Sequence, residues 1–216
     1  MQLKLFLKEE AAKLEVKLDN EAIDQLWAYK DFLKEYNEKV NLTAITDDEG
    51  IVTKHFLDCL TILPNIGQNS RVIDIGTGPG FPGLVAKIIR PDLDLTLLDA
   101  RGKKVKFLEE TAKLLDLQGV TCIHDRAEDR LKIQGYAKGF DYAVSRAVAS
   151  MDKLAGWSLP FVKSGGQFIA MKGPNFQEEL EAGGKQIAKL GGKVSKIIEL
   201  TLPSDLTRNL IIINRK

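Results

Sequence analysis

Hydrophobic and polar residues follow two different patterns along this chain, and the pattern changes near residue 66. In residues 21–40 the large apolar residues recur with helical spacing and fall on one stripe, and residues 3–18 give a similar but weaker pattern. Residues 54–63 predict a third helix that ends near Pro64. We therefore expect a helical N-terminal extension over residues 1–65, with a core-facing stripe made of Ile23, Leu26, Trp27, Phe32, Leu33, Tyr36 and Val40.

From residue 71 onward, short apolar runs alternate with helical segments. Seven runs are strand-like, and the last two, KVSKIIELTL and NLIIINRK, are separated only by the short connection PSDLTR. Strands that alternate with helices predict a parallel sheet covered on both faces, whereas the closing pair can form an antiparallel hairpin. Residues 66–216 are thus predicted to form a second domain of the α/β class, with a mostly parallel seven-stranded sheet.

The composition excludes several classes of protein. The chain has 216 residues, of which 44% are hydrophobic and 28% charged, which is ordinary for a globular protein and argues against disorder. Its two cysteines, Cys59 and Cys122, have no CxxC spacing, which fits a reduced cytosol and excludes a cysteine-rich zinc module. No apolar run approaches the roughly 18 residues of a membrane span. We therefore expect a cytoplasmic protein without membrane partners or a metal site.

The net charge of +1 conceals an uneven distribution. Residues 1–49 hold 7 Lys and Arg against 12 Asp and Glu, whereas the other 24 basic residues face 18 acidic residues in the remainder of the chain. The second part is therefore basic, with a balance of +6. A basic body is compatible with an anionic partner, although solvated surface charge is the ordinary explanation.

The strongest chemical signal is a glycine-rich turn, DIGTGPGFPG at 74–83, placed between the first strand and a helix. Glycines allow a sharp turn and a close approach of the backbone to a ligand. Gly78, Gly80 and Gly83 satisfy the dinucleotide pattern GxGxxG, but that motif should start directly at the end of the strand. The alternative register, acid-x-Gly-x-Gly-x-Gly from Asp74 through Gly76, is that of S-adenosylmethionine (SAM)-dependent methyltransferases. A carboxylate attracts a ligand that carries a cationic amine and repels a pyrophosphate, which favours SAM over a dinucleotide. A glycine turn with a purely structural role is the third possibility.

Two later segments support a nucleoside ligand. Asp99 ends the second strand, 19 residues after Gly80, where an acid can accept hydrogen bonds from ribose hydroxyls. After the third strand, Ala127 can contact an adenine and Glu128 can accept a hydrogen bond, although Glu128 can equally be an acid of a first helical turn. These features are shared by nicotinamide-dependent enzymes and methyltransferases.

Basic residues gather near the predicted carboxyl ends of the strands. Such side chains can position an RNA through its phosphates, and solvated charge is the alternative. Arg146 and Lys172 follow the fourth and fifth strands, where substrate residues belong, and each can instead form a structural ion pair. His55 is more typical of a packed residue, and Asn41 fits a turn as well as a substrate cleft. The candidate RNA-binding residues are Arg101, Lys103, Lys104, Arg126 and Arg130, with Lys106 in the same run as the first three.

Taken together, these motifs resemble the bacterial 16S rRNA guanine-N7 methyltransferase G family, also called the glucose-inhibited division protein B family. The resemblance covers nearly the whole chain. It rests on NEKVNLTAIT at 37–46, HFLDCL at 55–60, VIDIGTGPGFPG at 72–83, Arg126-Ala127-Glu128, VSRAVA at 144–149 and MKG at 171–173.

The resemblance implies a Rossmann-like SAM-dependent methyltransferase domain behind a helical extension. It implies methylation of N7 of one guanine in the 530 loop of 16S rRNA, with the rRNA or the small ribosomal subunit as partner. We also expect a monomer. Gly76 and Phe81 would contact SAM, Ala127 and Glu128 would flank its adenine, and Arg146 would stand between cofactor and substrate. We predict a cofactor set of Asp74, Gly76, Gly78, Phe81, Asp99, Ala127, Glu128 and Arg146, with Arg146 and Lys172 as catalytic residues.

Guanine N7 carries a lone pair and no proton at neutral pH, so in-line attack on the methyl group needs alignment rather than a general base. No evident base or nucleophile pair occurs in the sequence. Three alternatives stay open at this point. They are a methyltransferase with another substrate, a nicotinamide-dependent oxidoreductase, and an RNA-binding module without turnover.

Overall fold

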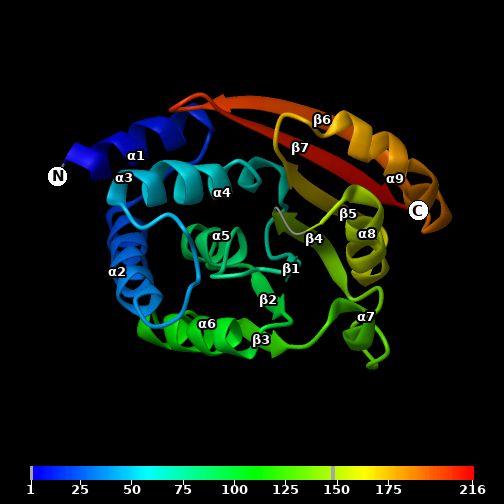
Figure 1. Ribbon diagram of the computed structural model, residues 1–216, viewed down its shortest axis with the longest axis horizontal. Helices are drawn as coiled ribbons and strands as arrows, with labels where there is room; N and C mark the ends of the chain where they lie inside the picture. Colours follow the sequence, from blue (N-terminus) through cyan, green and yellow to red (C-terminus); the bar gives the residue numbers. More distant parts are fainter. Residues whose placement is uncertain (1, 147–148) are drawn as a thin grey trace.

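The computed structural model describes residues 2–146 and 149–216, and its centre is one seven-stranded sheet (Figure 1). The strand order is β3-β2-β1-β4-β5-β7-β6, in which β7 is antiparallel to both of its neighbours and the other pairs are parallel. The predicted α/β class and the antiparallel closing hairpin are confirmed. The strands are β1 Arg71–Ile75, β2 Asp94–Asp99, β3 Val120–His124, β4 Phe140–Arg146, β5 Val162–Lys172, β6 Gly192–Leu202 and β7 Leu206–Arg215.

Helices cover both faces of the sheet (Figure 1). The helices that precede β1 lie on the same face as α5 and α6, whereas α8 and α9 lie on the opposite face. The α-helices are α1 Gln2–Lys13, α2 Asn20–Asn37, α3 Asp48–Gly50, α4 Asp58–Leu60, α5 Gly83–Ile89, α6 Gly102–Leu114, α7 Ala127–Arg130, α8 Met151–Ser158 and α9 Gln177–Lys189. A π-helical stretch covers Ile51–Leu57, and single 3₁₀ turns cover Leu63–Asn65 and Leu159–Phe161.

The two faces of the sheet explain the apolar runs in the sequence. Successive side chains of a strand point to opposite faces, so Ile169 and Met171 of β5 join the cluster under α2 and α5, while Phe168 and Ala170 join the cluster under α8. Because both faces are covered, the strands read as nearly continuous hydrophobic segments.

The N-terminal helices share a core with this sheet. Leu7 of α1 and Leu26 of α2 are fully buried in the same cluster as the apolar residues of β1, β2 and α5. The predicted stripe of α2 does face the core, but the sequence pattern missed Tyr29, which is fully buried. The last helical turn before the sheet ends at Asn65, and β1 starts at Arg71. The change from helices to strands therefore lies where the sequence predicted it. The division into two domains stays a prediction.

The third predicted helix is longer and begins earlier than expected. Instead of residues 54–63, the helical segment runs continuously from Asp48 to Leu60 through α3, the π-helical stretch and α4. Asp47 caps it, because its Oδ1 accepts a hydrogen bond of 2.6 Å from the Gly50 N–H. The periodicity of a mostly apolar segment did not reveal this cap. Lys54 and His55 belong to this helical segment, and both line the cavity described below.

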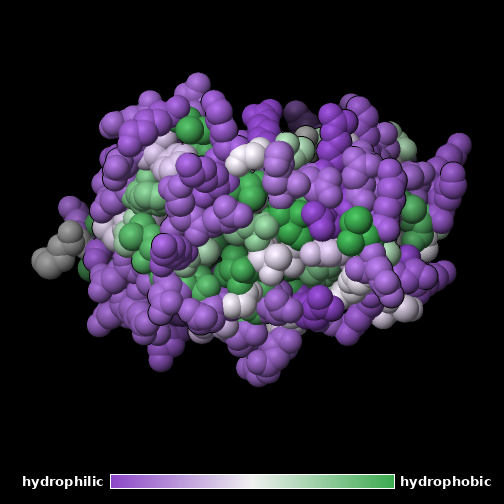
Figure 2. All heavy atoms as spheres, turned by 90° about the horizontal axis from the view of Figure 1, so that it is seen from below, coloured by the Kyte–Doolittle hydropathy of each residue, from purple (hydrophilic) through white to green (hydrophobic). Residues whose placement is uncertain are grey.

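Most of the surface is hydrophilic. Figure 2 shows the side of β3, α6 and α7, where hydrophobic atoms gather in the middle and charged or polar side chains surround them. Across residues 2–146 and 149–216, no helix combines the length and apolar character needed to cross a bilayer.

Candidate active site at the carboxyl edge of the sheet

The glycine-rich turn forms a loop directly after β1. Gly76, Gly78 and Gly80 have φ angles of 67°, 62° and 101°, a region that side chains other than glycine rarely adopt. Asp74 anchors this loop from below, because its Oδ2 accepts hydrogen bonds from Thr77 Oγ1 at 2.7 Å and from the Gly83 N–H at 2.8 Å. The local sequence therefore builds a backbone cradle at the edge where parallel sheets bind ligands.

Asp74 itself lies behind this cradle. Its side chain is completely buried, and it does not line the cavity described next. Burial raises the pKa of the Asp74 carboxyl to about 7, although the Thr77 and Gly83 hydrogen bonds act in the opposite direction. Its Oδ1 atom has no hydrogen-bond partner. The structure thus gives Asp74 a role in bracing the loop, and its predicted contact with the amine of SAM stays a prediction.

Asp99 ends β2 and faces the loop. Its Oδ2 accepts a hydrogen bond of 2.9 Å from the Gly78 N–H, and its Oδ1 accepts one of 2.9 Å from the Arg101 N–H. Asp99 lines the cavity, and each of its oxygens keeps acceptor capacity after these bonds. The carboxylate is therefore fixed in orientation and can accept hydrogen bonds from the hydroxyls of a ribose.

A cavity of about 790 Å³ joins these groups. Its volume is within the ordinary range of small-molecule and cofactor sites. The predicted residues that line it are Gly76, Gly78, Phe81, Asp99, Arg101, Lys104, Arg126, Ala127, Glu128 and Arg146. The fold brings them together because they follow the carboxyl ends of β1, β2, β3 and β4, which meet at one edge of the sheet.

The chemistry of these residues fits SAM. Gly78 leaves space above the loop, since a Cβ built on it would lie 3.5 Å from Lys104 Nζ. Ala127 offers a small apolar surface, and the exposed Glu128 beside it can accept a hydrogen bond from an adenine amino group. The anchored Asp99 carboxylate can accept hydrogen bonds from a ribose.

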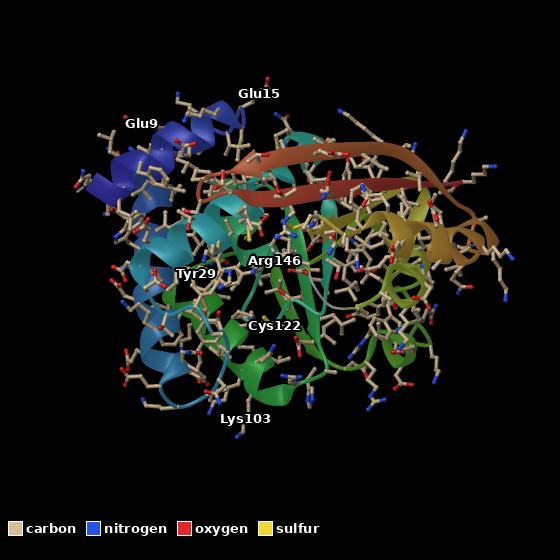
Figure 3. All side chains as sticks on the ribbon, turned by 45° about the horizontal axis from the view of Figure 1, so that its top comes forward. Glu9, Glu15, Tyr29, Lys103, Cys122 and Arg146 are labelled. Carbon is tan, nitrogen blue, oxygen red and sulfur yellow. The ribbon has the colours of Figure 1, made fainter. Side chains whose placement is uncertain are left out.

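Arg146 closes the other end of the cavity, in the interior of the molecule (Figure 3). Its Nη1 donates to Asp58 Oδ2 at 2.9 Å and to the Lys54 carbonyl at 3.1 Å. The guanidinium carbon lies 5.0 Å from the centre of the Phe81 ring. Arg146 therefore forms the ion pair that the sequence offered as an alternative, and at the same time lines the cavity.

His55 is a site residue that the sequence analysis treated as a packed side chain. Its ring stacks on Phe81 with 4.4 Å between ring centres, and its Nδ1 lies 3.1 Å from Arg146 Nη2. The same Nδ1 lies 3.1 Å from the Lys54 carbonyl, and Nε2 lies 3.0 Å from Thr43 Oγ1. Burial, together with the Arg146 charge, lowers the pKa of His55 to about 4, so the ring is neutral at pH 7.

Arg208 and Asp58 are two further residues that the sequence analysis missed. Asp58 is fully buried, and Arg208 of β7 donates to both of its oxygens, from Nε to Oδ1 at 2.5 Å and from Nη2 to Oδ2 at 2.8 Å. Arg208 lines the cavity, as do Ile45, Lys54, Trp157 and Leu206. Arg208 could have been noticed as a basic residue in the connection before the last strand. Asp58 lies in the motif HFLDCL, but the motif does not indicate which residues pair with it.

Three predicted residues lie elsewhere. Lys172 Nζ donates to Glu179 Oε2 and to the Ala149 carbonyl, both at 2.6 Å, and it does not line the cavity, so its contacts favour the ion-pair alternative over the catalytic assignment. Arg130 is 3.1 Å from Asp125 and lies over the Tyr136 ring. Lys103 projects outward from α6 (Figure 3). In the VSRAVA motif, residues 147 and 148 lie outside the described residues.

Asn41, Cys59 and Cys122 do not line this cavity. Asn41 is exposed, and it is Asn37 that organises the NLTAIT segment, because its Oδ1 accepts from the N–H groups of Leu42 and Thr43. Burial raises the pKa of both Cys59 and Cys122 to about 12, so neither is a ready thiolate. Among the described residues, no cluster of three His, Cys, Asp or Glu side chains is arranged for a metal ion.

The family model of rRNA small subunit methyltransferase G matches residues 22–211, which is most of the chain. The chain belongs to this family. It is therefore a SAM-dependent rRNA methyltransferase, and the nicotinamide-dependent alternative is wrong.

Curated relatives agree with this assignment over the full length. The ribosomal RNA small subunit methyltransferase G of Acetivibrio thermocellus is 48% identical over 217 aligned residues, which cover 100% of this chain and 89% of the relative. The protein of the same name from Alkaliphilus metalliredigens is 44% identical and covers 100% of this chain and 91% of the relative.

Solved structures support the fold. A SAM-dependent methyltransferase from Aquifex aeolicus aligns with a TM-score of 0.57 at 17% identity, over 83% of this chain and 97% of that one. Fibrillarin from Aeropyrum pernix, solved with natively bound SAM, aligns with a TM-score of 0.56 at 14% identity, over 68% of this chain and 66% of that one. The Rossmann-like methyltransferase fold is thereby established for this family member.

Proposed function

We propose that this enzyme transfers the methyl group of SAM to N7 of a guanine in the 530 loop of 16S rRNA. The observation that carries the choice of atom is that the described groups around Arg146 are unsuited to act as a general base. We call the part of the cavity lined by His55, Arg146 and Arg208 its acceptor end. A nucleophile that has no proton to lose, such as guanine N7, does not need a base there.

The chain's own residues would hold the donor as follows. The N–H groups and the open space of the glycine loop receive its amino acid part, Asp99 accepts from its ribose, and Ala127 and Glu128 border its adenine. When bound, SAM supplies a methyl group on a positively charged sulfur. Phe81 of the glycine loop packs against Arg146 of the acceptor end, so this pair would set the direction from which the guanine approaches.

The transfer then balances without a proton. The N7 lone pair forms the new bond to the methyl carbon while the bond between carbon and sulfur breaks, and the electron pair of that bond stays on sulfur. The products are N7-methylguanine, which is now cationic, and S-adenosylhomocysteine. Alignment of the three atoms is the main contribution of the protein to such a step.

The groups at the acceptor end are unsuited to act as a general base. His55 lies with its Nδ1 3.1 Å from Arg146 Nη2, and its pKa of about 4 makes it a weak base at neutral pH. Asp58 is buried between two arginines that occupy both of its oxygens. Asp74 has a pKa of about 7, but it is fully buried behind the loop.

The RNA would be positioned by the cations around the cavity. Arg101, Lys104 and Arg126 line it and are the candidates for this role, whereas Lys103 and Arg130, on the neighbouring helices α6 and α7, do not line it. Phosphate contacts of this kind fix orientation without reading the sequence. We propose that the partner is 16S rRNA or the small subunit, that the enzyme acts as a monomer, and that it acts in the cytoplasm.

The decisive experiment maps N7-methylguanosine along 16S rRNA from cells with and without this protein, and then restores the mark with purified enzyme and SAM. One modified guanine in the 530 loop should disappear and return. A modified residue at another atom or another RNA would overturn the assignment. Single-turnover rates should also be nearly flat from roughly pH 6.5 to 8.5, because no base has to be deprotonated. A tenfold rise in rate per pH unit would contradict that mechanism.

A further inference from the structure

Arg208 has a hydrogen-bonding arrangement that its contact with Asp58 does not exhaust. A guanidinium carries five N–H groups, and Asp58 accepts from one on Nε and one on Nη2. Within residues 2–146 and 149–216, the two N–H groups of Nη1 and the second one of Nη2 have no hydrogen-bond partner, and none of these nitrogens is a buried unpartnered atom. One edge of the Arg208 guanidinium is therefore bound to Asp58, and the other edge is free to donate hydrogen bonds. Arg208 lines the cavity.

The anchoring fixes where this open edge points. Asp58 is fully buried and holds Arg208 with two hydrogen bonds, and Arg146 holds the same carboxylate from the other side. The side chains of Arg146 and Arg208 are only 12% and 11% exposed. A planar guanidinium held in this way loses little further freedom when it binds a group with two acceptor oxygens.

The local charge selects an anion as that group. Two arginines surround one carboxylate, and the adjacent His55 is neutral, so this cluster keeps one excess positive charge. Lys54, whose side chain is exposed, also lines the cavity and adds a second cation. Arginine forms paired, parallel hydrogen bonds with carboxylate and phosphate oxygens.

Position separates Arg208 from the part of the cavity assigned to SAM. Arg146 lies over Phe81 of the glycine loop, whereas Arg208 hydrogen-bonds to Asp58, on the helical segment before β1. Arg208 stands at the start of β7, next to the exposed turn of the β6–β7 hairpin, which in Figure 1 lies beside the N-terminal helices. This is a wall of the cavity that an RNA strand can reach from outside.

We propose that Arg208 binds a backbone phosphate of the RNA substrate, through the guanidinium edge that Asp58 leaves open, next to the nucleotide that is methylated. Asp58 acts as a positioning residue, because it orients Arg208 and Arg146 toward the same space. The inference rests on the proposed function, since it assumes that an RNA enters this end of the cavity.

Arg208→Lys tests the proposal while preserving the buried ion pair. The single ammonium group of lysine can pair with Asp58 but cannot present a second planar edge. We expect thermal unfolding and the SAM dissociation constant to stay close to those of the unchanged protein. Affinity for a 16S rRNA fragment that contains the 530 loop should fall about tenfold, as for a lost charged hydrogen bond. In Arg208→Gln the slope of log affinity against log salt should also decrease by about 0.7 to 1.

Arg71→Lys is the matched control. Arg71 also pairs with a carboxylate, that of Asp94, but it lies at the opposite edge of the sheet at the start of β1. The substitution Arg71→Lys should leave RNA affinity unchanged. If Arg208→Lys weakens SAM binding instead of RNA binding, the open edge serves the carboxylate of SAM and the proposal is wrong.

If Arg208→Lys changes neither affinity, Arg208 is only a structural partner of Asp58, and the proposal is equally wrong. The proposed function is judged separately. The proposed function is wrong if the unchanged protein does not methylate the guanine. The Arg208 proposal is wrong if the unchanged protein methylates the guanine but Arg208→Lys binds the RNA equally well.

Discussion

Tyr29 of α2 and Pro79 of the glycine loop are joined by a hydrogen bond in which the phenol hydroxyl donates to the proline carbonyl. The ring of Tyr29 is fully buried, and its centre lies 5.6 Å from that of Phe81 in the same loop. Burial raises the pKa of Tyr29, so the hydroxyl keeps its proton and remains a donor. Helix α2, in the N-terminal part of the chain, thus supports the backbone of the glycine loop that we propose as the SAM cradle.

Tyr29→Phe should therefore weaken SAM binding as well as the fold. The substitution leaves the Pro79 carbonyl without its donor, at a cost of about 1–3 kcal/mol. Calorimetric titration with SAM and urea unfolding measure the two effects. Tyr36→Phe is the control, because Tyr36 lies on the same helix and packs on Phe107 without touching the loop. Equal effects of the two substitutions would show that the hydroxyl of Tyr29 does not support the cradle.

Gly78→Val should abolish SAM binding and leave the fold in place. A branched residue at φ 62° is strained by about 1–2 kcal/mol, and its side chain would enter the space between the loop and Lys104. SAM titration and circular dichroism check the prediction. Gly135→Val has a comparable φ of 91° in open surroundings and should bind SAM normally. Normal SAM binding by Gly78→Val would show that the glycine loop is not part of the SAM-binding site.

Arg146→Ala should lower single-turnover methylation by about 100-fold, because the guanine loses its alignment. SAM affinity should fall less, and Arg146→Lys should restore little, since an ammonium does not reproduce the planar contacts with Asp58 and His55. The pKa of His55, about 4, should rise part of the way toward its usual value in Arg146→Ala, because burial persists while the nearby charge is gone. Histidine NMR titration reports this shift. Full activity in Arg146→Ala would reduce the residue to a structural ion pair.

Asp74→Asn should change how stability depends on pH. The folded-state pKa of Asp74 is about 7, above its ordinary value of 3.8, so the folded protein binds a proton that the unfolded chain has released. This contribution is full below the unfolded pKa and is lost as pH rises through about 7. The unfolding free energy of the unchanged protein relative to Asp74→Asn should therefore fall from about pH 5 to pH 8, by at most about 1.4 kcal/mol per pH unit.

Urea unfolding of both proteins at several pH values measures this difference. Asp92→Asn serves as the control, because hydrogen bonding to Arg90 lowers the pKa of Asp92 to about 2. Asp92 is thus ionised in both states over that pH range, and its substitution should shift stability by a constant amount. A constant difference for Asp74→Asn as well would contradict the raised pKa.

Lys104→Gln should weaken RNA binding more than Lys103→Gln. Lys104 lines the cavity, whereas Lys103 is exposed and projects away from it (Figure 3). Loss of one phosphate contact should reduce the salt slope of RNA affinity by about 0.7 to 1 for Lys104 and should leave it unchanged for Lys103. Titration of a labelled rRNA fragment at several salt concentrations compares the two. An unchanged slope in both variants would assign both lysines to a solvated helix face, and an equal decrease in both would show that Lys103 also contacts a phosphate.

The sequence by itself determined the architecture and the cofactor loop, because both depend on local patterns. Strand-length apolar runs between helical segments predicted the sheet, and the closing pair predicted its antiparallel edge. The acid and glycines of 74–80 predicted a ligand-binding turn, since positive φ angles at Gly76 and Gly78 are a property of the residue type. Asp99, Ala127 and Glu128 were placed correctly at the cavity because the ends of parallel strands meet at one edge.

Only the tertiary structure decided which side chains meet at the acceptor end. Asp58 and Arg208 are 150 positions apart, and Tyr29 and Pro79 are 50 apart, so no periodicity connects them. Lys172 and Arg146 follow neighbouring strands and looked equivalent in sequence, yet Glu179 holds Lys172 away from the cavity while Asp58 holds Arg146 at it. Hydrophobic pattern sets which face of an element is buried, but the partner of a buried charge depends on how distant elements pack.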